Sequence, residues 1–301
     1  MSGSSNAPRA VLWLIVVLLL AVTAAALWRS GAFRPTPTIG LITPDRSQFW
    51  EDAILGAQHA AEEYGVVLEV RQADGKEPEQ SALLAELTDS GVSAIAISPL
   101  EANRQALQIR KVGERIPVVT LDSDSPLSDR LCFIGADNYT AGRTCGELVR
   151  EALPEGGTVV ISMGSPLKEN GRLRRQGVID ELLERSYGPG RPSEPLEGVH
   201  QGQSHAVTAT LVDENDPAQA KQNVLDLLAS GNVPDCIVAL YGYSGPAVVE
   251  ALAEAGHADD VVVIGVDVDD ETVRAIEDGR MYASIAQDPY NYGFHAVRIL
   301  A

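Results

Sequence analysis

Aromatic, carboxylate, guanidinium and amide side chains follow the apolar runs of this sequence instead of lying within them. The candidate ligand-binding set comprises Ser47, Phe49, Trp50, Asp122, Ser123, Arg172, Asn215, Tyr241, Asp267 and Gln287. A sugar ring has apolar CH faces, on which a flat aromatic ring packs, and a rim of hydroxyls that carboxylates and guanidinium groups bind by charge-assisted hydrogen bonds. The set therefore predicts a binding site for a small polyhydroxy ligand.

The same side chains allow two other interpretations. Phe49 and Trp50 are also suited to the core of a helix, and Asp122 or Asp267 to a helix cap. Two of the carboxylates would also suffice for a glycosidase, but the sequence does not give the separation on which that chemistry depends. No catalytic residue is assigned, and the chain is not predicted to be an enzyme.

Motifs for cofactor, phosphate and metal sites do not occur in the sequence. The segment 164–172 lies between a predicted strand and helix but lacks the residues of a phosphate-binding loop. Neither a Gly-x-Gly-x-x-Gly nor a Gly-x-Ser-x-Gly motif follows any apolar run. The histidines lack metal-ligand spacing, and Asp267, Asp269 and Asp270 lack the spacing of a calcium loop. Neither a cofactor nor a metal is predicted.

Short apolar, β-branched runs alternate with amphipathic segments from residue 38 onward. The expected strands are 38–43, 66–72, 92–98, 117–122, 132–137, 158–163, 206–212, 236–240, 261–267 and 282–287. Continuous apolar runs are typical of parallel strands that helices cover on both faces. The sequence therefore predicts an α/β fold with two doubly wound parallel-sheet lobes joined by a hinge. Ligands of such sheets bind where the carboxyl ends of the strands meet the following helices, which is where the candidate residues stand.

The first 36 residues differ in composition from the rest of the chain. Arg9 precedes an apolar run over 10–28, which Arg29 and a short Pro-containing stretch follow. This pattern predicts a signal peptide or an N-terminal membrane anchor, so the remainder is expected in the periplasm or another extracytoplasmic space. The formal net charge of −19 disfavours nucleic acid as a partner. The three cysteines are expected to be free thiols, with a Cys132–Cys145 bridge as the alternative.

Several segments, taken together and in order, resemble a known family. They are Gln48-Phe49-Trp50, 116–122, 134–138 with 141–143, Arg172 with Arg175 and Gly177, 263–267 and 285–290. Over 38–301 the chain is similar to the type I periplasmic sugar-binding proteins, close to their ribose-binding branch. The resemblance implies an N-terminal lobe of 37–136 plus 288–301, a C-terminal lobe of 137–287, and hinge crossings near Asp137 and Gln287.

The resemblance also implies roles for individual residues. Phe49 and Trp50 would stack on the sugar, while the hydroxyls would be bound by Asp122, Arg172, Asp267 and Gln287. Ser47 stands where ribose binders carry asparagine, Ser123 where they carry arginine, and 241–244 where they carry an Asn-containing turn. We therefore expect a sugar or cyclitol other than ribose. The family's chains continue beyond the segment that matches 287–290, so a truncated C-terminal end is expected.

The expected function is capture of a monosaccharide or related polyol by hinge closure and its delivery to an inner-membrane ABC permease. The chain is expected to act as a monomer. One alternative is a ligand-sensing domain that reports to a membrane receptor. Another is the core of a LacI-type regulator without its DNA-binding domain, although an apolar segment stands where the helix-turn-helix would be.

Overall fold

The computed structural model describes residues 13, 15–23, 35–186, 188 and 192–301. The chain divides into two compact units, Met1–Pro37 and Thr38–Ala301. In the first unit, the described residues 15–23 are helical. Within the described ranges no helix is both long and apolar enough to cross a membrane. The predicted export segment, 1–36, lies largely outside these ranges, so its role as signal peptide or anchor stays a prediction.

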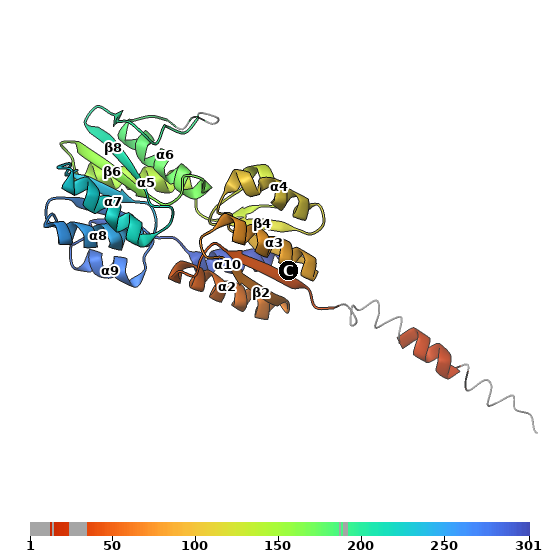
Figure 1. Ribbon diagram of the computed structural model, residues 1–301. Helices are drawn as coiled ribbons and strands as arrows, with labels where there is room; N and C mark the ends of the chain where they lie inside the picture. The colour runs from red at the N-terminus through yellow and green to blue at the C-terminus, as the bar shows by residue number, and fades with distance from the viewer. Residues whose placement is uncertain (1–12, 14, 24–34, 187, 189–191) are drawn as a thin grey trace, which may run out of the picture. The chain divides into compact units, whose positions relative to one another are not determined.

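The second unit contains two sheets, each with helices on both faces (Figure 1). The first sheet has the strand order β2-β1-β3-β4-β5, and all its paired strands are parallel. Its elements are β1 (Thr38–Thr43), α2 (Gln48–Tyr64), β2 (Val67–Gln72), α3 (Glu77–Ser90), β3 (Ala94–Ile97), α4 (Ala102–Gly113), β4 (Val118–Leu121), the short helix η1 (Pro126–Ser128) and β5 (Phe133–Ile134). The last helix of the chain, α10 (Pro289–Leu300), also packs on this sheet.

Alternation along β1 explains why helices cover both faces of the first sheet. Leu41 points into a core that α2 and α10 complete, whereas the next residue, Ile42, belongs to the core beneath α3 and α4. Both side chains are fully buried. A strand with apolar residues on both faces must be covered on both, as the continuous apolar runs predicted.

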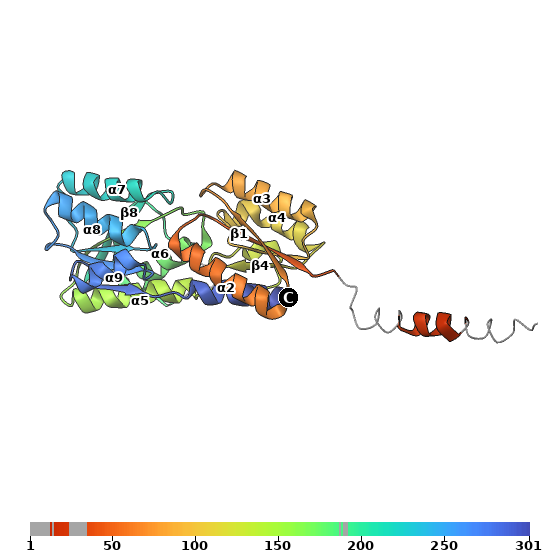
Figure 2. The same cartoon turned by 90° about the horizontal axis from the view of Figure 1, so that it is seen from below.

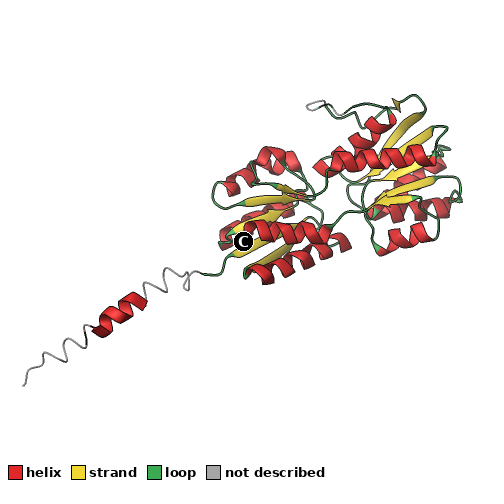
Figure 3. Cartoon of the chain, turned by 180° about the vertical axis from the view of Figure 1, so that it is seen from behind, coloured by secondary structure: helices red, strands yellow, loops and turns green. Residues whose placement is uncertain are grey.

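The second sheet has the order β11-β10-β9-β6-β8-β7 and is parallel except for β7, which pairs antiparallel with β8. Figures 2 and 3 show the helices that pack against this sheet. Its strands are β6 (Gly157–Met163), β7 (His200–Gln201), β8 (His205–Val212), β9 (Cys236–Ala239), β10 (Val262–Val266) and β11 (Ala283–Ile285). Its helices are α5 (Asn138–Ala152), α6 (Glu169–Leu182), α7 (Pro217–Ala229), α8 (Ser244–Ala255) and α9 (Asp270–Glu277). Side chains of α5 and α6 fill one core, and those of α7, α8 and α9 fill the other.

One helix pair in each lobe packs backbone against backbone through glycines. A Cβ atom added to Gly56 of α2 would lie 1.9 Å from the carbonyl oxygen of Tyr290 in α10. In the second lobe, a Cβ atom added to Gly142 of α5 would lie 2.0 Å from the carbonyl oxygen of Arg174 in α6. Real Cβ atoms do not approach so closely, so only glycine permits either crossing.

The predicted fold class, α/β with parallel-sheet lobes, is confirmed. Two details differ from the expectation. The expected strand 132–137 is reduced to Phe133–Ile134, because Asp137 already caps α5 by accepting a hydrogen bond from the backbone N–H of Thr140. The antiparallel β7 had no counterpart among the expected strands. All three cysteines are free thiols, as expected, and the alternative Cys132–Cys145 bridge is not formed. The lobe limits given above remain predictions.

Candidate functional site

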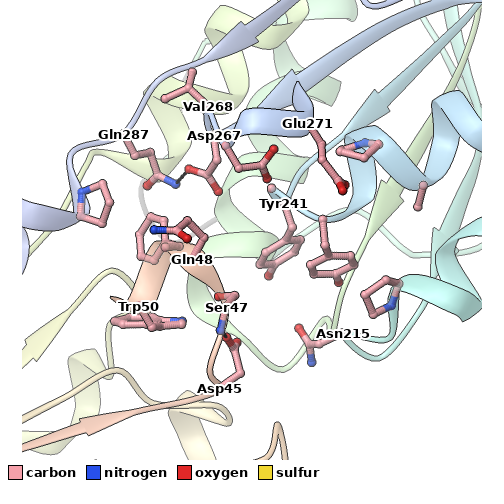
Figure 4. Close-up of a pocket in the computed structure, with 18 of the residues that line it drawn as sticks. Asp45, Ser47, Gln48, Trp50, Asn215, Tyr241, Asp267, Val268, Glu271 and Gln287 are labelled. Atoms are coloured by element: carbon pink, nitrogen blue, oxygen red, sulfur yellow. Dashed lines mark hydrogen bonds between the residues drawn. The ribbon is translucent and has the colours of Figure 1, made fainter. Parts of the chain in front are cut away.

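The carboxyl ends of the strands of both sheets surround one large cavity. It has a volume of about 1170 Å³ and is lined by the loops that follow β1, β4, β6, β8, β9, β10 and β11 (Figure 4). Most of the sequence-predicted residues line it: Ser47, Phe49, Trp50, Asp122, Asn215, Tyr241, Asp267 and Gln287. The placement follows from topology, since parallel strands deliver all these loops to the same edge of their sheet.

Two predicted residues do not line the cavity. Ser123 is fully buried, and its hydroxyl oxygen has no hydrogen-bond partner among the described residues. Arg172 turns away and pairs with Glu169 at 2.6 Å, while its guanidinium also donates to the hydroxyl of Ser193 at 2.7 Å. The assignment of Arg172 to the cavity is therefore wrong. The cavity instead contains Arg174, since residues two apart on a helix point in directions roughly 200° apart.

Arg174 is the centre of the site. It is 1% exposed and donates three hydrogen bonds, to the Asn138 amide oxygen at 2.8 Å, the Leu240 carbonyl oxygen at 2.9 Å and the Gln287 amide oxygen at 2.9 Å. Its Nη2 atom also lies 3.7 Å from a carboxylate oxygen of Asp122. Groups from both lobes therefore meet at one guanidinium. Two of its partners, Asn138 and Gln287, lie at or next to the predicted hinge crossings.

Two carboxylates of the cavity stand in strained backbone conformations. Asp122, directly after β4, has φ 60°, and Asp267, directly after β10, has φ 75°. A left-handed φ is unfavourable for any residue that has a Cβ atom. Such strained residues are found most often at functional sites. Gln287 donates a 2.6 Å hydrogen bond to Asp267, which aligns that carboxylate beside Arg174. Burial raises the pKa of Asp267, although Arg174 and the Gln287 hydrogen bond oppose the rise.

Asp122 connects the two lobes. One of its carboxylate oxygens accepts a 2.9 Å hydrogen bond from the Asn170 amide at the start of α6. Burial raises the pKa of this carboxyl from 3.8 to about 6, with Arg174 and Lys168 acting in the opposite direction. The cost of burial thus exceeds the attraction of two cations, because water is largely excluded from this part of the cavity.

Aromatic rings flank the charged groups. Phe49 and Trp50 meet edge to face, with ring centroids 5.0 Å apart and an interplanar angle of 73°. Trp50 is 4% exposed and belongs to the core beneath α2, while it also lines the cavity. Tyr241 and Tyr243 stack on the other lobe at 5.9 Å and 18°. The arrangement offers flat apolar surfaces beside a polar rim, which suits a sugar ring.

Sequence reasoning did not assign several polar residues of the site and its surroundings, among them Asn138, Lys168, Asn170 and Arg174. Arg174 lies one helical turn before Val178, which packs in the core of the second lobe. Most residues of α6 from 170 to 182 are buried, so the helix has little apolar periodicity, and its sequence pattern did not separate Arg174 from Arg172. No sequence pattern identifies Lys168, because it lies in the loop before α6, outside the helical periodicity.

No set of three or more His, Cys, Asp or Glu side chains that could hold a metal ion occurs in the described part of the chain. The chemistry available at the site is hydrogen bonding and ring stacking. The wall carries both charged donors and charged acceptors, which can bind the hydroxyls of one ligand.

Comparison with known proteins gives a consistent result. A family model described as a periplasmic binding protein domain matches residues 39–301. The ribose import binding protein of Salmonella typhimurium is 23% identical over 286 residues, which covers 95% of this chain and 90% of that protein.

Two solved structures are similar to the chain. A glucose-galactose binding protein from Geobacillus stearothermophilus superposes with a TM-score of 0.80 and 24% identity, over 89% of this chain and 90% of that one. An ABC transporter solute-binding protein from Burkholderia graminis, solved with D-arabinose, has a TM-score of 0.77 and 26% identity, over 88% of this chain and 87% of that one.

Proposed function

We propose, from the premise that this chain belongs to the periplasmic binding protein family, that it captures a monosaccharide or related polyol and delivers it to an ABC permease. The family consists of sugar-binding transport proteins and not of enzymes, so the prediction that the chain is not an enzyme is confirmed.

The observation that carries the proposal is the convergence on Arg174. Its guanidinium bonds to Gln287, which aligns Asp267, and it faces Asp122 from the other lobe. Trp50 and Phe49 supply the flat surface on the first lobe. A ligand held between these groups touches both lobes at once, so its binding energy depends on their relative position.

The proposed mechanism is hinge closure. The chain passes from the first sheet to the second between β5 and α5, and returns between β11 and α10. A ligand that contacts Trp50 and Asp122 on one side and Arg174 and Asp267 on the other favours the closed state by its extra contacts. The closed state would then present a surface to the permease.

The proposed ligand is a sugar or cyclitol other than ribose. Ser47 and Asn215 line the cavity and offer a short hydroxyl and an amide. Tyr241 and Tyr243 add phenol groups on the same side, although both hydroxyls already donate, to Asn170 and Asp213 respectively. The polar groups therefore differ from those that the ribose-binding resemblance implies.

The test is a thermal-shift screen of the full chain against pentoses, hexoses and inositols, followed by isothermal titration calorimetry on each hit. Binding should also change the fluorescence of Trp50. The variant Trp50→Phe separates the signal of Trp50 from the signals of Trp13 and Trp28. We expect one neutral sugar or cyclitol to bind in the micromolar range or tighter. Turnover of a bound sugar, detected by product analysis, would overturn the proposal in favour of a glycosidase.

The remaining parts of the proposal concern place and partner. We propose that the protein is a monomer in the periplasm or another extracytoplasmic space, secreted or held there by residues 1–36. Fractionation of cells that express the full chain tests the location. Light scattering of the purified protein tests the oligomeric state. Recovery of the protein in the cytosolic fraction would argue against export.

A further inference from the structure

Lys168 is a buried cation at the cavity wall. It precedes the first residue of α6 and is 5% exposed, yet it is one of the residues that line the cavity. Burial lowers the pKa of its ammonium group, and neighbouring carboxylates oppose that change. A lysine is rarely so buried unless a partner compensates its charge.

The protein supplies no such partner within hydrogen-bonding distance. Among residues 35–186, 188 and 192–301, no carboxylate oxygen lies within 4.0 Å of Lys168 Nζ, and no acceptor takes a hydrogen bond from it. The ammonium lies 5.6 Å from the centre of the Tyr241 ring, a cation–π contact that leaves its three N–H donors unused.

The three carboxylates that act on Lys168 through space accept hydrogen bonds from other groups, although Asp213 Oδ2 has no partner among the described residues. Asp122 accepts from Asn170, as described above. Asp213 accepts a 2.6 Å hydrogen bond from the Tyr243 hydroxyl, and Asp45 accepts one of 2.9 Å from the backbone N–H of Ser47. Each of the three acts on Lys168 through space without contacting it. The donors of Lys168 therefore remain available to whatever occupies the cavity.

We propose that Lys168 is a ligand-contacting residue that donates hydrogen bonds to an oxygen of the bound sugar and selects for ligands with an oxygen at that position. The inference rests on the proposed function and adds a specificity determinant to it. A buried donor left unpaired is costly, so a ligand without the matching oxygen forfeits much of its affinity.

The charge around Lys168 indicates a neutral ligand oxygen and not an acidic group. The ammonium interacts electrostatically with three carboxylates, those of Asp45, Asp122 and Asp213. Arg174 is the one cation among the groups that act on it. A ligand carboxylate placed beside Lys168 would meet these three carboxylates in a region of low dielectric constant. A hydroxyl or ring oxygen accepts the same hydrogen bond without that repulsion.

The test compares Lys168→Met with Lys111→Met. Methionine retains the length of the side chain but removes the charge and the donors. Lys111 is exposed on α4, outside the cavity, so its variant matches the charge change. Circular dichroism and Tm check that both variants fold, and Lys168→Arg serves as a second variant that keeps the donors. The probes are D-glucose, D-galactose and D-arabinose, their monodeoxy derivatives and D-galacturonate, titrated by calorimetry.

We expect one monodeoxy derivative to bind the wild-type protein at least tenfold more weakly than its parent sugar. Lys168→Met should bind the parent at least tenfold more weakly and no longer distinguish it from that derivative, while Lys111→Met behaves as wild type. Lys168→Arg should retain part of the discrimination.

Two results would overturn the inference while leaving the proposed function intact. One is parent binding by Lys168→Met within twofold of wild type. The other is tighter wild-type binding of D-galacturonate than of D-galactose. If none of the probes binds the wild-type protein, the proposed function fails for these sugars, and the inference about Lys168 fails with it.

Discussion

Arg174 and Gln287 lie 113 positions apart in the sequence and are joined by a 2.9 Å hydrogen bond. Arg174 belongs to α6, whereas Gln287 stands between β11 and α10, where the chain returns to the first sheet. Any ligand that displaces or tightens this bond therefore acts directly on a crossing segment.

Replacing Arg174 by lysine should weaken sugar binding by about tenfold to a hundredfold. Lysine keeps the charge but cannot reproduce a fork that bonds Asn138, Leu240 and Gln287 together. Calorimetric titration with the best sugar of the screen measures the effect. Arg172→Lys is the matched control on the same helix, and equal losses in both variants would contradict the assignment of Arg174.

Asp122→Asn should stabilise the unliganded protein at neutral pH. Because burial raises the pKa of Asp122 from 3.8 to about 6, the folded state binds the proton more tightly than the unfolded state. The stability contribution of this group is therefore fully present below about pH 4 and is lost as pH rises through 6. The asparagine variant avoids that loss, on the order of 2 to 3 kcal/mol, and it tolerates the left-handed φ of 60°.

Urea unfolding of wild type and Asp122→Asn at pH 4.5 and pH 7.5 checks this pH dependence. The stability gain of the variant should shrink at the lower pH. A gain that is the same at both pH values would mean that the carboxyl titrates with an ordinary pKa.

Gly142→Ala should destabilise the protein by about 1 to 3 kcal/mol and weaken ligand binding. The new methyl group would collide with the carbonyl oxygen of Arg174, so α6 and its guanidinium must shift. Gly113→Ala is the control, because a Cβ atom there meets nothing within 4 Å at the end of α4. Thermal unfolding compares the two, and a neutral Gly142→Ala would argue that the helices have room to separate.

Reducing agents should leave Tm unchanged. Cys145 and Cys236 are buried, and burial raises the pKa of the Cys145 thiol to about 12. A thiol-specific reagent should therefore label both slowly in the folded protein and rapidly in urea. A drop in Tm on reduction would indicate a disulfide.

The sequence contained enough information for the fold and for many of the strand-end loops that line the cavity. Strand ends are marked by the change from apolar to polar residues, and topology brings those ends together, so Asp122, Asp267 and Gln287 could be assigned without coordinates. Helical phase was the weak point, since Arg172 and Arg174 are both plausible until the buried face of α6 is known.

Other features depend on long-range contacts that no local pattern records. Lys168 is buried only because the loop before α6 folds against Tyr241 and the first lobe. The two-residue strand β7 exists only because β8 is beside it. Tertiary placement decides both, and neither has a periodic signal in the sequence.

The glycine crossings in the two lobes have a mechanical consequence. The helix after the first passage, α5, is locked against α6 at Gly142, and the helix after the second, α10, is locked against α2 at Gly56. Backbones in direct contact cannot slide or tilt without a clash. Each lobe should therefore move as a rigid body during closure. The backbone dihedral changes should be confined to the few residues between β5 and α5 and between β11 and α10.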